Sequence, residues 1–97
     1  MTGKQKRYLR ALAQPLRPVV NLGKQGLSQE TRREIEVQLL DHELIKLKVL
    51  DNCPLTKKEC ADELSRAKSL EVVKVIGKTL VLYYPHPDEP EIELPAT

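Results

Sequence analysis

The sequence predicts an α/β fold: one compact domain with a mixed four-stranded sheet, helices packed on it, and the element order α-β-α-β-α-β-β. Three observations predict this class. Stretches with helical spacing of apolar residues alternate with stretches of strand-like spacing. A Ser or Thr precedes each helical stretch as an N-cap, and a Gly-Lys connection joins the last two strands. Ninety-seven residues suffice for one core of this kind and are too few for a second.

The first helix is predicted to begin after Thr2 and to end at about Ala13. Thr2 and Gln5 fit a capping box, in which each side chain bonds the backbone N–H of the other residue. At about 100° per residue, one side of this helix faces the core and the opposite side is cationic. The inward positions are Gln5, Tyr8, Leu9 and Leu12, and the outward cations are Lys6, Arg7 and Arg10. No carboxylate on this helix balances its four cations, which favours a nearby anion over a plainly solvated face.

A short strand over residues 19–22 follows, because Pro15 and Pro18 cannot lie within a helix and favour extended backbone before them. This strand leads directly into a loop at residues 23–26, and Ser28 is a preferred N-cap for the second helix. That helix carries Ile35, Val37, Leu39 and Leu40 and is predicted to end near Asp41. The loop therefore lies at the carboxyl end of a strand and the amino end of a helix, where open α/β sheets commonly bind ligands.

The loop itself, Gly23-Lys24-Gln25-Gly26, has the chemistry of a phosphate-binding turn. Glycine lacks a Cβ, so the backbone at Gly23 and Gly26 can adopt positive φ and lie close to another molecule. A turn that opens a helix also presents unpaired N–H groups at the positive end of the helix dipole, which attracts an anion. Arg32 and Arg33 lie near this helix end, where the dipole disfavours a cation by about 0.3–1 kcal/mol unless an anion is docked there. Because a bare G-x-x-G also occurs in ordinary turns, a loop that binds nucleic-acid backbone is a hypothesis at this point.

The second strand is predicted over residues 44–50, where apolar residues alternate with lysines. Its Lys46 and Lys48 share one face, so one side of the sheet is predicted to be solvent-exposed and basic at this strand. Thr56 and Glu59 form another capping box, which opens a smaller third helix. The apolar stripe of that helix consists of Cys60, Ala61, Leu64 and Ala67.

Two further strands are predicted over residues 72–76 and 79–84, and Gly77-Lys78 between them suits a type II′ hairpin. From residue 85 onward, four prolines and four carboxylates fall among thirteen residues. Such a composition predicts a flexible acidic tail, or at most a weak edge strand through Ile92 and Leu94. The predicted domain therefore covers residues 1–84, and residues 85–97 form the tail.

The charge distribution is polarised along the chain. Residues 1–33 hold eight basic side chains and one acidic one, whereas residues 34–97 hold eight basic and thirteen acidic. This polarisation indicates that one end of the molecule faces a polyanion, with chance clustering on a solvated surface as the alternative. Three tyrosines, with no Phe or Trp, argue against a base-stacking platform and for contacts to the sugar-phosphate backbone.

Signatures of catalysis and of metal binding are missing from the sequence. Gly77-Lys78-Thr79 resembles the end of a nucleotide-binding P-loop, but position 72 is valine where that motif needs glycine. Cys53 and Cys60 have neither a C-x-x-C spacing nor a histidine at ligand spacing, which predicts reduced thiols. No apolar run approaches the roughly 18 residues of a membrane span. We therefore expect a cytoplasmic protein that is not an enzyme and has no cofactor, metal, small-molecule substrate or membrane partner.

Five stretches of the chain together resemble a known family. They are TGKQKRYLR (residues 2–10), LRPVV (16–20), LGKQGLS (22–28), HELIKLKV (42–49) and VIGKTLVLY (75–83). In this order they are similar to the YhbY-like or CRM domain (chloroplast RNA splicing and ribosome maturation), over residues 2 to about 85. One departure is the segment 68–72, where the family leads us to expect a glycine or small turn and the chain has Ser69-Leu70-Glu71. The departure concerns the end of the third helix and not the loop.

The resemblance implies a fold similar to the C-terminal domain of translation initiation factor three and RNA binding through the G-x-x-G loop. It also implies an association with precursors of the large ribosomal subunit, as for bacterial single-domain members. Gly23 and Gly26 would let the loop approach the RNA backbone, Lys24 and Gln25 would contact it, and further cations would flank it. The expected flanking residues are Lys4, Arg7, Arg10, Arg17, Arg32 and Arg33.

The sequence thus predicts a monomeric RNA-binding protein that acts in ribosome assembly and contacts ribosomal RNA of the large-subunit precursor. A second interpretation is a protein–protein adaptor whose basic end docks an acidic partner. A third keeps the fold and makes the protein a translation factor that binds the small subunit. The first interpretation requires positive charge and free N–H groups to converge at one accessible corner.

Overall fold

The computed structural model describes residues 1–96 and confirms the predicted fold class. Three helices and four strands follow one another in the predicted order, α-β-α-β-α-β-β. They are α1 (Gly3–Ala13), β1 (Pro18–Leu22), α2 (Gln29–His42), β2 (Leu44–Val49), α3 (Lys57–Ser65), β3 (Glu71–Ile76) and β4 (Thr79–Tyr83). The sheet has the strand order β1-β2-β4-β3, with β1 parallel to β2 and the other two pairings antiparallel. The sheet is therefore mixed, as predicted.

Side-chain caps begin all three helices as the sequence predicts. The Thr2 hydroxyl accepts a hydrogen bond from Gln5 N at 3.2 Å, and the Gln5 side chain accepts one from Thr2 N at 3.1 Å. Thr56 and Glu59 make the same reciprocal pair at α3. At α2, the Ser28 hydroxyl accepts from Thr31 N at 3.2 Å. Each cap occupies a backbone donor that a helix start would otherwise leave free.

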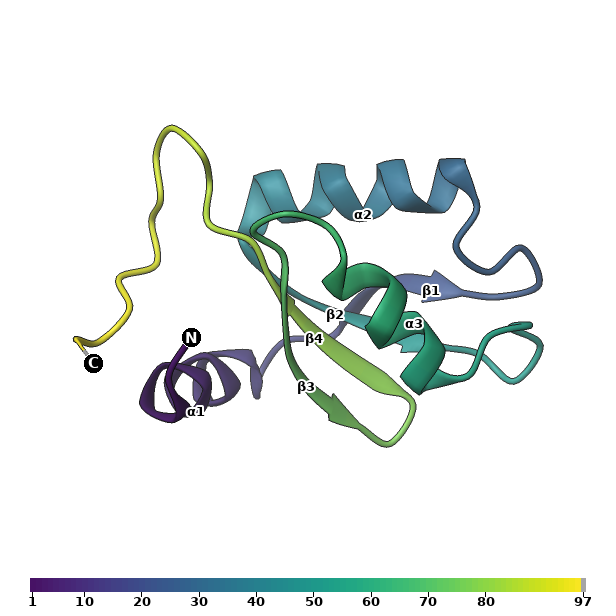
Figure 1. Cartoon of the computed structure of the whole chain (residues 1–97), viewed down its shortest axis with the longest axis horizontal. Helices are drawn as coiled ribbons and strands as arrows, with labels where there is room; N and C mark the ends of the chain where they lie inside the picture. The colour runs from purple at the N-terminus through teal and green to yellow at the C-terminus, as the bar shows by residue number, and fades with distance from the viewer. Residues whose placement is uncertain (97) are drawn as a thin grey trace.

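The helices cover the two faces of the sheet unequally. The larger apolar cluster lies between the sheet and the pair α2 and α3, and the smaller one lies between the sheet and α1 (Figure 1). The larger cluster contains Val20, Leu22, Ile45, Leu47, Val49, Leu80 and Leu82 from the strands, with Ile35, Leu39, Cys60 and Leu64 from the helices. The smaller cluster contains Leu9, Ala13, Leu44, Val73, Val81 and Tyr83. We call these two sides of the sheet the α2/α3 face and the α1 face.

The first helix is rotated relative to the sequence-based expectation. Leu9 and Ala13 are fully buried, whereas Tyr8 and Leu12, which were expected in the core, are exposed. The cause is that α1 touches the sheet along a narrow stripe at one end, through one residue per turn. A single helix over one end of a sheet buries less than the 100°-wide face that the apolar spacing suggested.

Two turns have the backbone that their sequences require. Gly77 has a φ of 57° while Lys78 keeps a negative φ, which is the pattern of the predicted type II′ hairpin between β3 and β4. Ser69 has a φ of 69° in the turn between α3 and β3, where the family resemblance predicted a glycine or a small turn. The serine therefore adopts the left-handed conformation itself, and α3 ends at Ser65, before the predicted Ala67.

The C-terminal tail, predicted as a flexible segment or a weak edge strand, contacts the rest of the domain at several points. Residues 85–96 form no helix or strand, yet Ile92 and Leu94 pack against the smaller apolar cluster beneath α1. The side-chain amide of Gln5 also donates to Pro95 O at 3.2 Å. Figure 1 shows this segment leaving β4 and returning to the N-terminal end of α1. The tail therefore completes the core on the α1 face.

Glu43 holds this tail in place. It follows α2 with a φ of 62°, and only 4% of its surface is exposed. Its carboxylate accepts three backbone hydrogen bonds, from His86 N at 2.8 Å, Glu91 N at 2.8 Å and Ile92 N at 2.9 Å. Burial alone would raise the pKa of Glu43, but these three donors and the nearby His86 side chain lower it below its ordinary value. This contact could not be predicted from local sequence patterns, because it joins residues more than 40 positions apart.

Candidate nucleic-acid interface

The G-x-x-G loop is a tight turn with two exposed residues at its tip. Gly26 N donates to Gly23 O at 2.9 Å, which closes a four-residue turn around Lys24 and Gln25. Both central residues are exposed and have negative φ, so the turn is of type I. Within residues 1–96, the backbone N–H groups of Lys24 and Gln25 donate no hydrogen bond. They are therefore available to an anion at the tip.

The two glycines of the loop have different roles. Gly26 has a φ of 58°, is buried, and has space for a Cβ only at 3.3 Å from Pro54. Gly23 has an ordinary φ, and a Cβ there would lie 3.4 Å from Asn52. Because Gly26 is covered by the segment after β2, its place in the loop is to turn the chain toward α2. A ligand can come close to the backbone at Lys24 and Gln25, where the loop is exposed.

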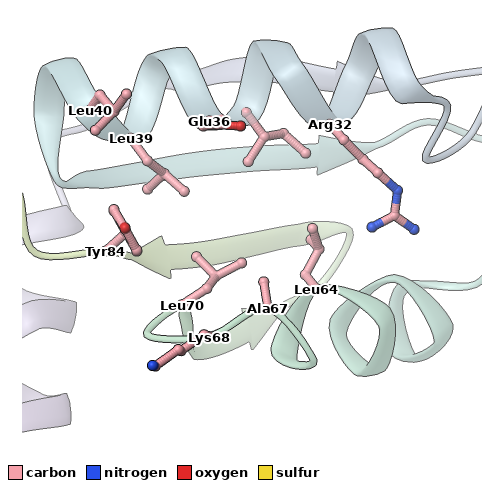
Figure 2. A pocket seen from close by; sticks show the side chains of 10 residues that line it. Arg32, Glu36, Leu39, Leu40, Leu64, Ala67, Lys68, Leu70 and Tyr84 are labelled. Atoms are coloured by element: carbon pink, nitrogen blue, oxygen red, sulfur yellow. The ribbon is translucent and has the colours of Figure 1, made fainter.

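The two arginines at the start of α2 lie on the α2/α3 face. Arg32 donates from Nε to Leu27 O at 3.1 Å and pairs with Glu63 of α3 at 3.6 Å. Figure 2 shows Arg32 extending from α2 toward α3 at one end of a largely apolar hollow of about 280 Å³. Arg33 is exposed on the same helix. Arg32 is thus close to the loop in sequence, but its charge is partly neutralised and directed toward α3.

The cations of α1 lie far from the loop. Lys4, Arg7 and Arg10 are exposed on α1, which packs at the end of the sheet where β2 begins and β4 ends. The loop follows β1, at the end where β2 finishes. Figure 1 shows α1 and this loop at opposite ends of the molecule, whose longest extent is 39 Å. The prediction that the positive charge converges at one corner is therefore wrong.

A row of lysines on the α1 face joins the two regions. Lys46 and Lys74 both stand opposite Val81, and Lys48 stands opposite Thr79 and Asn21. Residues directly paired across strands share a face, so the three lysines lie on the side of α1. This side is open where α1 ends, and Lys46 Nζ reaches Gln14 O, just after α1, at 3.3 Å. We call Lys46, Lys48 and Lys74 the lysine row.

The lysine row has no acidic partner among the described residues of the open sheet surface. The other residues paired across this surface include Pro18, Asn21, Ile76 and Thr79, whereas Glu71 lies at the other end, beside Tyr83. Lys78 in the hairpin is paired with Asp51. Lys46 and Lys48 lie two positions apart on β2, and Lys74 lies on β3, on the other side of β4. A polyanion laid across this surface is attracted to all three cations.

The sequence predicted two of the three residues of the lysine row. Lys46 and Lys48 were visible in the alternation of residues 44–50, and their predicted place on one face is confirmed, with Lys48 exposed and Lys46 half-buried. Lys74 was missed because a bulge between Val72 and Lys74 shifts the side-chain alternation of β3. Arg17, in the connection between α1 and β1, is exposed and lies near the α1 end of this surface. Lys48 stands beside Asn21, near the start of the loop, and Lys46 reaches Gln14, just after α1, so the lysine row lies between the loop and α1.

Residues 1–96 contain neither a cluster of metal-ligand side chains nor a membrane-spanning helix. Within residues 1–96, no group of three or more His, Cys, Asp and Glu is placed to hold a metal ion. None of the helices in that range has both the length and the apolar character needed to cross a bilayer. Cys60 is fully buried, and its burial and the adjacent Cys53 raise the pKa of its thiol to about 11.

Comparison with known proteins places the chain among small proteins of matching length. It is 40% identical to the Probable RNA-binding protein YqeI of Bacillus subtilis, over 98% of this chain and 99% of that one. It is 42% identical to a protein of Haemophilus influenzae named RNA-binding protein, over 98% and 95% of the two chains.

A solved structure and a family model agree with these relatives. The solution structure of SAV1595 from Staphylococcus aureus, a hypothetical protein proposed to bind RNA, is 45% identical and superimposes with a TM-score of 0.79. The match covers 98% of this chain and 99% of SAV1595. The model of the CRS1/YhbY (CRM) domain matches residues 1–84. On these grounds the chain belongs to the CRS1/YhbY (CRM) domain family.

Proposed function

We propose that the protein binds RNA along the strip formed by the loop tip, the lysine row and the outer surface of α1. The observation that carries this proposal is the lysine row, whose three cations share one open sheet surface without a carboxylate beside them. The names of the relatives from B. subtilis and H. influenzae support the class of ligand. Phosphate is the part of RNA that such a surface recognises best.

The arrangement of these cations favours binding of the RNA backbone over recognition of its base sequence. Lys24 and the free N–H groups at the loop tip contact one stretch of RNA backbone, and the cations of α1 contact another. Strand β2 has six residues, so at about 3.3 Å per residue the central part of the strip is about 20 Å long. Phosphate contacts position a protein on RNA without identifying its bases, so selection here comes from RNA shape.

The salt dependence of binding tests this mechanism. If the strip neutralises about four phosphates, the slope of log affinity against log salt is about −3. Affinity then falls about fifty-fold between 50 and 200 mM salt. A filter-binding series with a structured ribosomal RNA fragment measures this slope. Binding that is insensitive to salt contradicts the proposal.

Charge-reversal variants locate the site. Lys24→Glu changes the loop tip and Lys48→Glu changes the lysine row, and both are expected to weaken binding of unrelated RNAs alike. Lys68→Glu makes the same change in charge in the turn after α3 and should leave affinity within about two-fold. Equal loss in all three variants would indicate a general charge effect and not this site.

We further propose that the bound RNA belongs to the precursor of the large ribosomal subunit and that the protein acts in its assembly as a monomer. The family resemblance supports this choice, and a surface that contacts phosphates suits a target recognised by its shape. Sucrose-gradient fractionation of cells tests it, with the protein expected in large-subunit precursor fractions. Recovery with small-subunit particles would support the translation-factor interpretation instead.

A further inference from the structure

The side chain of Tyr8 is not part of the apolar core. The rotation of α1 buries Leu9 and Ala13 and leaves Tyr8 and Leu12 on one flank of the helix, each 39% exposed. The other two tyrosines differ, because Tyr83 is buried and Tyr84 is half-buried. Among the described residues, Tyr8 is therefore the most exposed aromatic side chain, and it lies on the most cationic helix.

The neighbours of Tyr8 are cations and small or apolar residues. Lys4 lies one turn before it and Leu12 one turn after it, and residues at these spacings are adjacent on a helix surface. Ala11, at the third position after Tyr8, is too small to cover the ring. The guanidinium of Arg7 is folded back over the first turn, where it comes within 3.4 Å of the Cβ position of Gly3. Helix α1 contains no carboxylate that could neutralise these cations.

This combination fits one ligand chemistry best. The face of an aromatic ring stacks on a nucleic-acid base, and adjacent cations hold the phosphates on either side of that base. A base inside a regular duplex cannot offer its face, so the ligand has an unpaired or splayed nucleotide. A protein partner would satisfy the apolar pair of Tyr8 and Leu12, but it would leave the cations around them without an anion.

We propose that Tyr8 stacks on an unpaired base of the bound RNA, with Leu12 beside it and Lys4 and Arg7 on the flanking phosphates. This inference rests on the proposed function and adds a preference to it: RNA with an unpaired nucleotide near a helix is bound more tightly than a plain duplex. The low aromatic content of the sequence argued against base stacking. The single ring of Tyr8, at the α1 end of the cationic strip, is enough to stack on one base.

Two RNA probes test the proposal, a hairpin with an unpaired loop of mixed sequence and a blunt duplex of the same stem. Tyr8→Ala is expected to reduce affinity for the hairpin by about five- to a hundred-fold, which is the range found for removal of one base–aromatic stack. Tyr8→Phe keeps the ring and should bind within about two-fold of the wild type. Neither variant should change duplex affinity or the salt slope, because no phosphate contact is removed.

The NMR signals of the Tyr8 ring provide a second measurement. The ring protons of Tyr8 should move upfield in the NMR spectrum when the hairpin is added, as a base stacks on them. Urea unfolding checks that Tyr8→Ala is folded, which its exposure leads us to expect. Unchanged hairpin affinity in Tyr8→Ala, an equal loss in Tyr8→Phe, or an equal loss for the duplex would each overturn the proposal.

The outcome for stacking is separable from the outcome for RNA binding. If Lys24→Glu and Lys48→Glu weaken binding while Tyr8→Ala does not, the strip is the RNA site and stacking is absent. If the lysine variants and high salt leave binding unchanged, the proposed function itself fails.

Discussion

Replacement of Glu43 by Gln tests whether the acidic tail belongs to the folded core. The carboxylate of Glu43 accepts three backbone N–H groups, two at Oε1 and one at Oε2. A glutamine has one acceptor oxygen, which can still take the hydrogen bonds from Glu91 N and Ile92 N. The NH₂ group of the glutamine then faces the backbone N–H of His86. Both groups are hydrogen-bond donors, so the hydrogen bond from His86 N to the charged carboxylate is lost and is not replaced.

The expected cost is about 2–4 kcal/mol. A hydrogen bond to a charged group contributes about 1.5–3 kcal/mol, and a buried donor without a partner costs about 1–3 kcal/mol, but the terms overlap and do not add fully. Only 4% of the Glu43 surface is exposed, so water replaces the missing acceptor poorly. Against a typical stability of about 5–15 kcal/mol for a whole domain, this is a large fraction.

The pH dependence of stability gives an independent check. The folded protein lowers the pKa of Glu43, so folding is favoured by this group above its unfolded pKa, and the contribution is lost as pH falls through the lower folded pKa. The difference in free energy of unfolding between wild type and Glu43→Gln should therefore be greatest near neutral pH and shrink in acid.

Urea unfolding and amide hydrogen exchange measure these effects. We expect faster exchange at Glu91 and Ile92 in Glu43→Gln, together with the lower free energy of unfolding. Glu89→Gln is the control, because it makes the same change on the exposed part of the tail and should cost less than about 0.5 kcal/mol. A cost below that limit for Glu43→Gln, with unchanged exchange, would refute the role assigned to Glu43.

Three further predictions follow from backbone and thiol geometry. Gly26→Ala should lose about 1–2 kcal/mol in urea unfolding because φ is 58°, whereas Gly23→Ala, with an ordinary φ, should be nearly neutral; equal losses would contradict the different roles of the glycines. Ser69→Gly should stabilise the protein by up to about 1 kcal/mol by relieving a φ of 69°, and a loss would show that the serine side chain matters. With a pKa of about 11 and full burial, Cys60 should resist alkylation at pH 8 in the folded protein, while the partly exposed Cys53 reacts, as mass spectrometry of the labelled peptides can show.

The fold could be predicted closely because its signals are local. Capping boxes at Thr2 and Thr56, the N-cap at Ser28 and the glycine of the last hairpin each depend on residues at most three positions apart. The alternation in residues 44–50 fixed which side of β2 is buried. These features determine the elements and their order, and short connections then limit how the strands can pair.

The site was predicted less well because its geometry depends on distant contacts. Nothing near Gly26 in the sequence shows that Pro54 covers it, and nothing near Tyr8 shows that α1 is rotated. The tail was expected to be flexible from its composition, yet Glu43 and the smaller apolar cluster hold it. Local charge counting suggested one basic corner, whereas the topology of the sheet spreads the cations into a strip.

The position of bound RNA on the protein is the most direct test of the proposed site. A titration of isotopically labelled protein with the hairpin RNA, followed through backbone amide and lysine side-chain NMR signals, locates the contact directly. We predict that the largest changes fall at the tip of the loop, in the lysine row and on the outer surface of α1. Changes confined to the α2/α3 face, around Arg32 and the hollow between these helices, would contradict it.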